Sequence, residues 1–111
     1  MAGTLYDAYL VQATVTAADN SHTVVRAIEA YDAAVYCTTS AAGGTVQVRK
    51  NGVNLTDAMT CAVANAADRA DTFDNTQRLF VAGDTMNFVI ANAAVGVVTV
   101  HCFVTDSGAA G

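Results

Sequence analysis

The sequence predicts an all-β protein, folded as one antiparallel β-sandwich, with a single short helix left open. Three observations carry this prediction. Stretches in which apolar and polar residues alternate, the pattern of half-buried strands, recur along the chain. An Asn-Gly pair, the strongest short hairpin signal, stands at Asn51-Gly52 between two β-like stretches. Proline is absent from the 111 residues, and turns must therefore rest on Gly, Asn and Asp.

The first predicted strand lies near the N-terminus. Its alternation places Tyr9, Val11, Ala13 and Val15 on one face and Leu10, Gln12, Thr14 and Thr16 on the other. At 111 residues the chain is expected to form one domain, 1–111, with flexible ends at 1–4 and 106–111.

Residues 22–39 carry a mixed pattern. They read as strand or as helix, and their alanines favour a helix. We predict two strands around "EAYDAA", because "VYCTTS" is rich in β-forming residues. Residues 57–70 leave the same choice between strand and helix open.

The Asn51-Gly52 pair predicts a type I′ turn, which needs positive φ at both central residues. Pairing across this turn follows directly. Lys50 should oppose Val53, Arg49 should oppose Asn54, and Val48 should oppose Leu55.

Two further strands are predicted in the C-terminal half. One carries Met86, Phe88 and Ile90 on one face, and the other carries Val98, Val100, Cys102 and Val104. Together they are expected to pair as an antiparallel hairpin over 85–105. The Gly83-Asp84 pair before them predicts a corner, in which Gly83 takes positive φ and Asp84 bonds the backbone two residues on.

Composition and charge limit the classes of partner that the chain can be expected to bind. Hydrophobic residues make up 53% of the chain, but aromatic residues only 7%, because Ala and Val dominate. Small side chains bury little area each, so association with copies or partners is favoured. Five basic residues face ten acidic ones, a net charge of −5, which argues against binding nucleic acid or an anionic membrane.

Targeting and redox features complete this picture. The chain shows no apolar run long enough to span a bilayer and no secretory leader, so we expect a protein made and used without export. Cys37, Cys61 and Cys102 are odd in number and lack metal-ligand spacing. Buried free thiols in a reducing compartment are the favoured interpretation, and one disulfide bridge, for instance between Cys61 and Cys102, is the alternative.

The residues whose side chains could serve catalysis or metal binding are better explained by structural roles. Asp68, Asp71 and Asp74 could surround a cation, but their spacing is more typical of a solvated loop. Asp19, Ser21 and His22 are triad residue types too close in sequence to align, and His101 is more typical of an interface or a hydrogen bond. We therefore expect no enzyme, no cofactor and no metal site.

One resemblance concerns residues 44–105. The stretch "TVQVRKNGVNL", followed later by "LFVAGDTMNFVIANAAVGVVTVHCFV", is similar to the jelly-roll β-sandwiches of trimeric viral decoration (cement) proteins. That group also resembles C1q and tumour-necrosis-factor domains. The shared features are a strand ending in "KNG", a "GDT" corner entering an alternating strand, and a closing valine-rich strand.

The resemblance implies a homotrimer on the outer capsid surface of a tailed phage, bound to the major capsid protein and made in the host cytoplasm. We expect part of the coat-binding or intersubunit surface near the N-terminus, at Leu5, Tyr6, Tyr9 and Leu10. A trimeric fibre-tip or glycan-binding receptor knob is the alternative that the same sandwich would serve.

Overall fold

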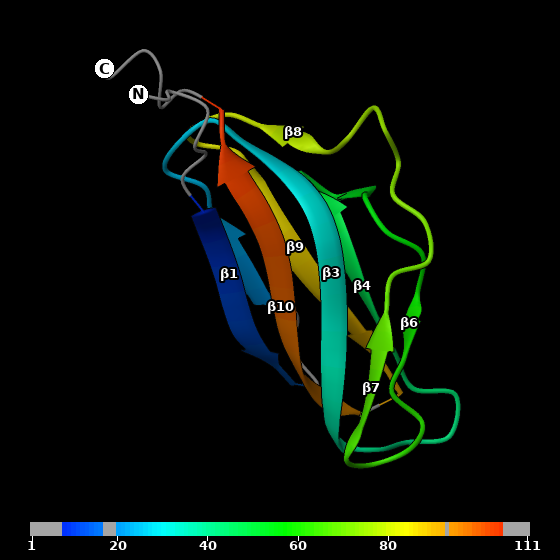
Figure 1. The fold of residues 1–111 in the computed structure, drawn as a ribbon. Helices are drawn as coiled ribbons and strands as arrows, with labels where there is room; N and C mark the ends of the chain where they lie inside the picture. The colour runs from blue at the N-terminus through cyan, green and yellow to red at the C-terminus, as the bar shows by residue number, and fades with distance from the viewer. Residues whose placement is uncertain (1–7, 17–19, 93, 106–111) are drawn as a thin grey trace.

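The protein is an antiparallel β-sandwich (Figure 1). The computed structural model describes residues 8–16, 20–92 and 94–105, and within these ranges every regular element is a strand. The predicted fold class is confirmed, and the short helix left open is not found in the described part of the chain. The ends at 1–4 and 106–111, expected to be flexible, lie outside the described residues.

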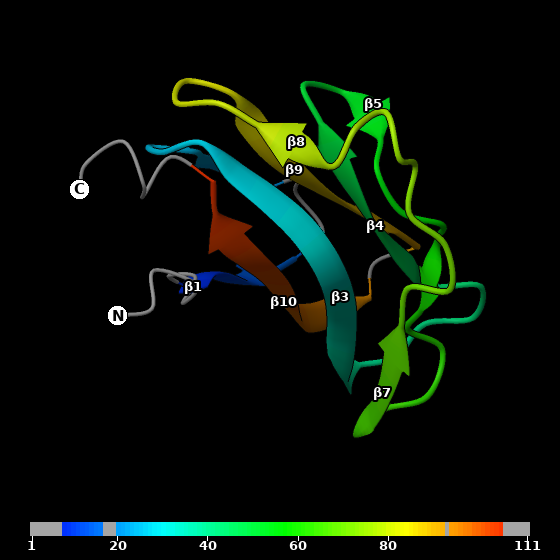
Figure 2. The ribbon, with the colours of Figure 1, turned by 45° about the horizontal axis from the view of Figure 1, so that its top comes forward.

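Two sheets form the layers of the sandwich. Sheet A contains, in spatial order, β1 (Ala8–Val15), β10 (Val95–Val104), β3 (Ile28–Thr39) and β7 (Ala66–Arg69), and β8 (Leu79–Phe80) also pairs with β3. Sheet B contains β2 (Asn20–Thr23), β9 (Thr85–Ala91), β4 (Thr45–Lys50) and β5 (Val53–Asn54), and β6 (Met59–Thr60) also pairs with β4. Figure 2 shows the two layers from a second direction.

The strand pairs are nested like those of one long hairpin. The first strand pairs with the last, β2 pairs with β9, β3 pairs with β8 and β7, and β4 pairs with β5 and β6. Rolling this hairpin up brings β10 against β3 and β9 against β4. The result is the jelly-roll strand order, in which β1, β3 and β10 lie in one sheet and their chain neighbours β2, β4 and β9 lie in the other.

This topology corrects the hairpin predicted over 85–105. Both strands exist, as β9 and β10, but they lie in different sheets and do not pair. Each has one fully apolar face, and both faces point into the same core from opposite sides. A local hairpin would place those faces side by side in one layer, whereas separation lets them cover each other.

Strand β3 corrects the prediction of two strands around "EAYDAA", because it runs unbroken from Ile28 to Thr39. The pairing with β10 shifts between His101 and Cys102, leaving Tyr31 as an extra residue, a β-bulge. Buried positions therefore change parity, from Ile28 and Ala30 to Ala33, Val35 and Cys37. That change explains the mixed pattern in the sequence.

Residues 57–70 form no helix. They contain the short strands β6 and β7, one in each sheet, joined by turns. Ala66 and Ala67 adopt a strand conformation because the pairing of β7 with β3 overrides their helix propensity.

The Asn51-Gly52 turn is confirmed. Both residues have positive φ, 49° and 83°, as a type I′ turn requires. Lys50 pairs with Val53 and Arg49 with Asn54, as predicted. The Leu55 N–H donates to the Val48 carbonyl at 2.9 Å, which continues the predicted pairing.

The core is filled by small and medium side chains from both sheets. The apolar rows of β9 and β10 are buried, among them Phe88 and Val100 at 0% exposure. In β1, Val11 and Val15 are buried, and Tyr9 and Ala13 of the same row are half-buried. Phe80 is the largest side chain contributed by β8. Burial raises the pKa of the Cys102 thiol to about 12, so this thiol stays protonated and behaves as a small apolar group.

The cysteine predictions need correction. Cys37 and Cys61 form a disulfide, with Cα atoms 5.1 Å apart, and Cys102 alone among the three is free. The bridge ties β3 in sheet A to the segment that follows β6 in sheet B. Cys102 is no candidate partner, because Cys37 pairs with Gly96, six residues or roughly 20 Å away along β10.

Candidate interaction surface

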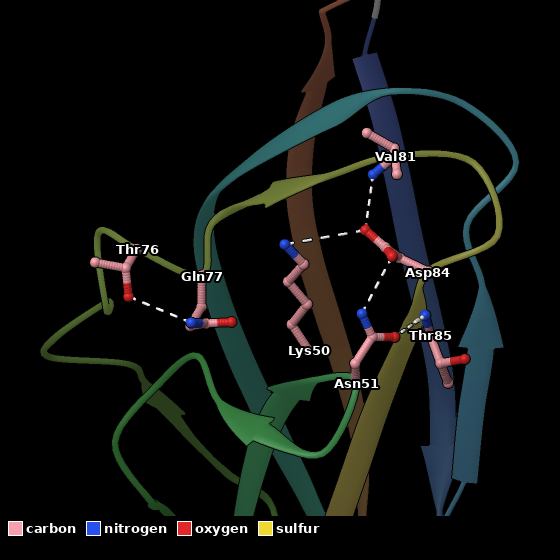
Figure 3. A network of polar contacts seen from close by, with 7 residues as sticks. All are labelled: Lys50, Asn51, Thr76, Gln77, Val81, Asp84 and Thr85. Carbon is pink, nitrogen blue, oxygen red and sulfur yellow. Dashed lines mark hydrogen bonds and ion pairs between the residues drawn. The ribbon is translucent and has the colours of Figure 1, made fainter.

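The Gly83-Asp84 corner is held by a polar network that also includes the Asn51 turn (Figure 3). Gly83 has φ of 97°, as predicted. The Asp84 carboxylate accepts hydrogen bonds from the Val81 N–H at 2.9 Å and from Asn51 Nδ2 at 3.1 Å. It therefore bonds backbone three residues earlier, not two residues later as predicted. Asn51 completes the link, since its Oδ1 accepts from the Thr85 N–H at 2.8 Å.

These bonds make the corner a structural joint. The bond from Val81, and after it the bond from Asn51, hold the pKa of Asp84 below its ordinary value, and Lys50 adds a weaker attraction at 4.0 Å. The Val24 N–H also donates to the Asp84 carbonyl at 2.8 Å. The joint therefore connects the residue after β2 to the loop before β9. A carboxylate committed to backbone and amide donors is typical of a turn.

Two of the three aspartates considered for a cation, Asp68 and Asp74, accept hydrogen bonds from backbone N–H groups. Asp68 Oδ2 accepts from the Thr60 N–H at 2.7 Å. Asp74 Oδ1 accepts from the hydroxyl and the N–H of Thr76, and these bonds lower the pKa of Asp74. Within the described ranges, no group of three or more His, Cys, Asp or Glu side chains is placed to hold a metal ion.

The two histidines lie in different places. His22 Nε2 lies 2.8 Å from the Tyr9 hydroxyl, a hydrogen bond that joins β1 to β2 at the open margin of the sandwich. Ser21 precedes His22 on the same strand and points to the opposite face, so the two do not form a nucleophile and base pair. Asp19 lies outside the described residues.

His101 lies on the outer face of sheet A, within the group of side chains we call the sheet A patch. The patch crosses four strands and consists of Leu10, Tyr31, Leu79, His101 and Phe103. The Tyr31 ring stacks on Phe103, with centroids 5.4 Å apart and planes 26° apart, and lies 6.1 Å from the His101 ring. Leu10 is directly opposite His101 in the β1–β10 pairing.

The patch is notable for how much of it faces solvent. Leu10 is 59% exposed, Leu79 56% and Tyr31 50%. Charged side chains also lie on this face. Glu29 pairs with Phe103 on one side and with Leu79 on the other, and Arg69 makes two hydrogen bonds to the Asp32 carboxylate, at 2.9 and 3.3 Å. Exposed apolar and aromatic side chains often mark protein interfaces.

The predicted interface residues separate in the structure. Leu10 belongs to the patch, whereas Tyr9 is half-buried and turned toward His22. Leu5 and Tyr6 lie outside the described residues. Tyr31 has the same odd parity as the buried residues Val35 and Cys37, but the bulge turns its side chain outward. The shift in apolar parity along residues 28–37 was the available signal.

A shallow hollow beside β7 offers no catalytic alternative. It is lined by Thr60, Val63, Ala66, Ala67 and Asp68, and its only ionisable group is the carboxylate already bonded to Thr60.

Comparisons with protein-family models, with curated proteins and with solved structures found no match to this chain. In the described part of the chain no helix is long and apolar enough to cross a membrane.

Proposed function

We propose that this chain is a structural protein of a tailed-phage particle, which assembles as a homotrimer and binds the major capsid protein on the outer capsid surface. The sheet A patch is the observation that carries the association itself. The resemblance of residues 44–105 to decoration proteins supplies the particle, and the jelly-roll strand order supports it.

The mechanism is addition of contact area. Each subunit offers a modest patch of apolar and aromatic side chains, of the types enriched at interface cores. A trimer presents three such patches to a repeating lattice. Once one subunit is bound, the next binds at high effective concentration, so weak single contacts produce firm attachment.

The test has two parts. Native mass spectrometry of the purified protein should show a trimer. Co-sedimentation with expanded, undecorated phage heads should show saturable binding that Tyr31→Ser weakens at least about tenfold, because a central aromatic contact is often worth 1–2 kcal/mol or more.

The matched control is Gln47→Ala on the outer face of sheet B, which should bind like the wild type. A strictly monomeric protein, or heads that bind Tyr31→Ser and wild type equally, would contradict the proposal.

A glycan-binding knob remains a second candidate, favoured by one observation. Tyr31 and Tyr36 expose 50% and 45% of their surface on the same side of sheet A, and sugar rings stack on such faces. A glycan array separates the two candidates, since selective binding abolished by Tyr36→Ala would favour the knob.

A further inference from the structure

The two sheets end in strands of very different character. Most marginal strands are short: β5, β6 and β8 have two residues each, and β2 and β7 have four. β7 also carries Asp68 and Arg69. Strand β1, by contrast, has eight residues, "AYLVQATV", with no charge and no proline.

Strand β1 also lacks the distortions that protect natural edges. Its eight residues pair with β10 in unbroken register, without a bulge. Short length, charge, proline and bulges are the usual means by which exposed edges avoid pairing with other chains. Strand β1 uses none of them, and it lies at the margin of sheet A (Figure 1).

The chemistry of this margin specifies its partner. In an antiparallel sheet every second residue of an edge strand points its N–H and C=O away from the sheet. No described strand pairs with those groups of β1. Another strand would supply hydrogen-bond partners for this row of backbone N–H and C=O groups.

We infer that β1 pairs antiparallel with β1 of a second copy of this chain, so that sheet A continues across a two-fold axis. Charge does not oppose a copy at this edge. The chain carries a net charge of −5, so contacts between copies are opposed wherever carboxylates meet. Strand β1 brings together none of them.

Symmetry keeps the pairing free of mismatches. A two-fold axis perpendicular to the sheet places outer residues opposite outer residues and inner residues opposite inner ones. The outer row then meets only Ala8, Leu10, Gln12 and Thr14 of the other copy. Leu10 would lose much of its exposed surface, since it lies both at this edge and in the sheet A patch.

This contact goes beyond the proposed function. A closed trimer uses a three-fold contact, whereas β1 pairing needs a two-fold one, so the pairing would link neighbouring trimers rather than build them. The two proposals can therefore be contradicted separately. An absence of capsid binding would not contradict the edge pairing, and an absence of edge pairing would not contradict the trimer.

The experiment is analytical ultracentrifugation of the full chain over a wide concentration range. The wild type should associate in even multiples, as dimers or as pairs of trimers. Gln12→Lys places like charges at the two-fold contact and should raise its dissociation constant by roughly tenfold. Thr99→Lys is the matched control, because Thr99 lies opposite Gln12 on the same face, one strand further in.

Amide hydrogen exchange gives a second readout. Association through the edge should slow exchange at alternate residues of β1, those whose N–H groups do not bond β10. The inference is overturned by a wild type that forms no even multiples up to about millimolar concentration. It is equally overturned if Gln12→Lys associates like the wild type, or if Thr99→Lys weakens association as much, which would place the contact on the sheet face.

Discussion

The side chains on the outer faces of the two sheets make different kinds of contact. On sheet B, Gln47 donates to the Thr56 carbonyl at 2.9 Å, and Asn87 accepts from the Gly52 N–H at 2.8 Å. On the outer face of sheet A, the Tyr31 ring stacks on the Phe103 ring, and half of the Tyr31 surface is exposed to solvent. Sheet B is thus bonded to its own loops, and sheet A keeps an apolar surface available. We therefore expect the outer face of sheet B to contribute mainly to stability and sheet A to association.

Breaking the link between the sheets should have the largest effect. The double variant Cys37→Ser, Cys61→Ser removes a bridge that closes a 24-residue separation. Loop-closure entropy predicts a loss of about 3 kcal/mol in the free energy of unfolding. Urea unfolding measures this loss, and the wild type in reducing agent should match the variant. Equal midpoints with and without the bridge would contradict the prediction.

The second-largest loss of stability is expected at the Gly83-Asp84 corner, on the sheet B side. Asp84→Ala removes an acceptor of two hydrogen bonds and should cost about 2 kcal/mol at neutral pH, since bonds to charged groups contribute roughly 1.5–3 kcal/mol. Thermal or urea unfolding gives the measurement. Asp71→Asn, which removes the same charge from an exposed side chain, should change stability little.

The pH dependence of that effect has a definite sign. The pKa of Asp84 is lowered in the folded state, so its carboxylate stabilises the fold above the unfolded value of about 3.9. That contribution is lost as pH falls through the lower folded-state value. The difference between wild type and Asp84→Ala should therefore shrink below about pH 4. A difference that stays constant down to pH 2 would show that the charge is unimportant.

A smaller loss is expected on the outer face of sheet B itself. Gln47→Ala leaves the Thr56 carbonyl without its side-chain donor and should cost about 1 kcal/mol. Binding and association should be unaffected. Chemical unfolding measures the stability of Gln47→Ala, and co-sedimentation measures its binding to phage heads. Weaker binding by this variant would show that both faces take part in association.

The smallest effect on stability should come from sheet A. Tyr31→Ser loses one stacked ring at a half-exposed position, worth about 0.5 kcal/mol. The same variant should lose most partner binding. If it unfolds far more easily than Gln47→Ala, the patch serves the fold of the protein rather than a partner.

The sequence by itself determined the local elements. Alternation defined the two faces of β1, β9 and β10, and Asn51-Gly52 specified a turn together with its register, because only certain residues accept positive φ. Gly83 was recognised as a corner for the same reason. These features depend on neighbours along the chain.

Only the tertiary structure decided how distant elements meet. It placed β9 and β10 in opposite sheets, kept β3 continuous through the Tyr31 bulge, and paired Cys37 with Cys61. The exposed patch and the open β1 edge depend on the same decisions. Period-two patterns say which face of a strand is buried, but not which strand covers it, and that choice is made by packing across the whole core.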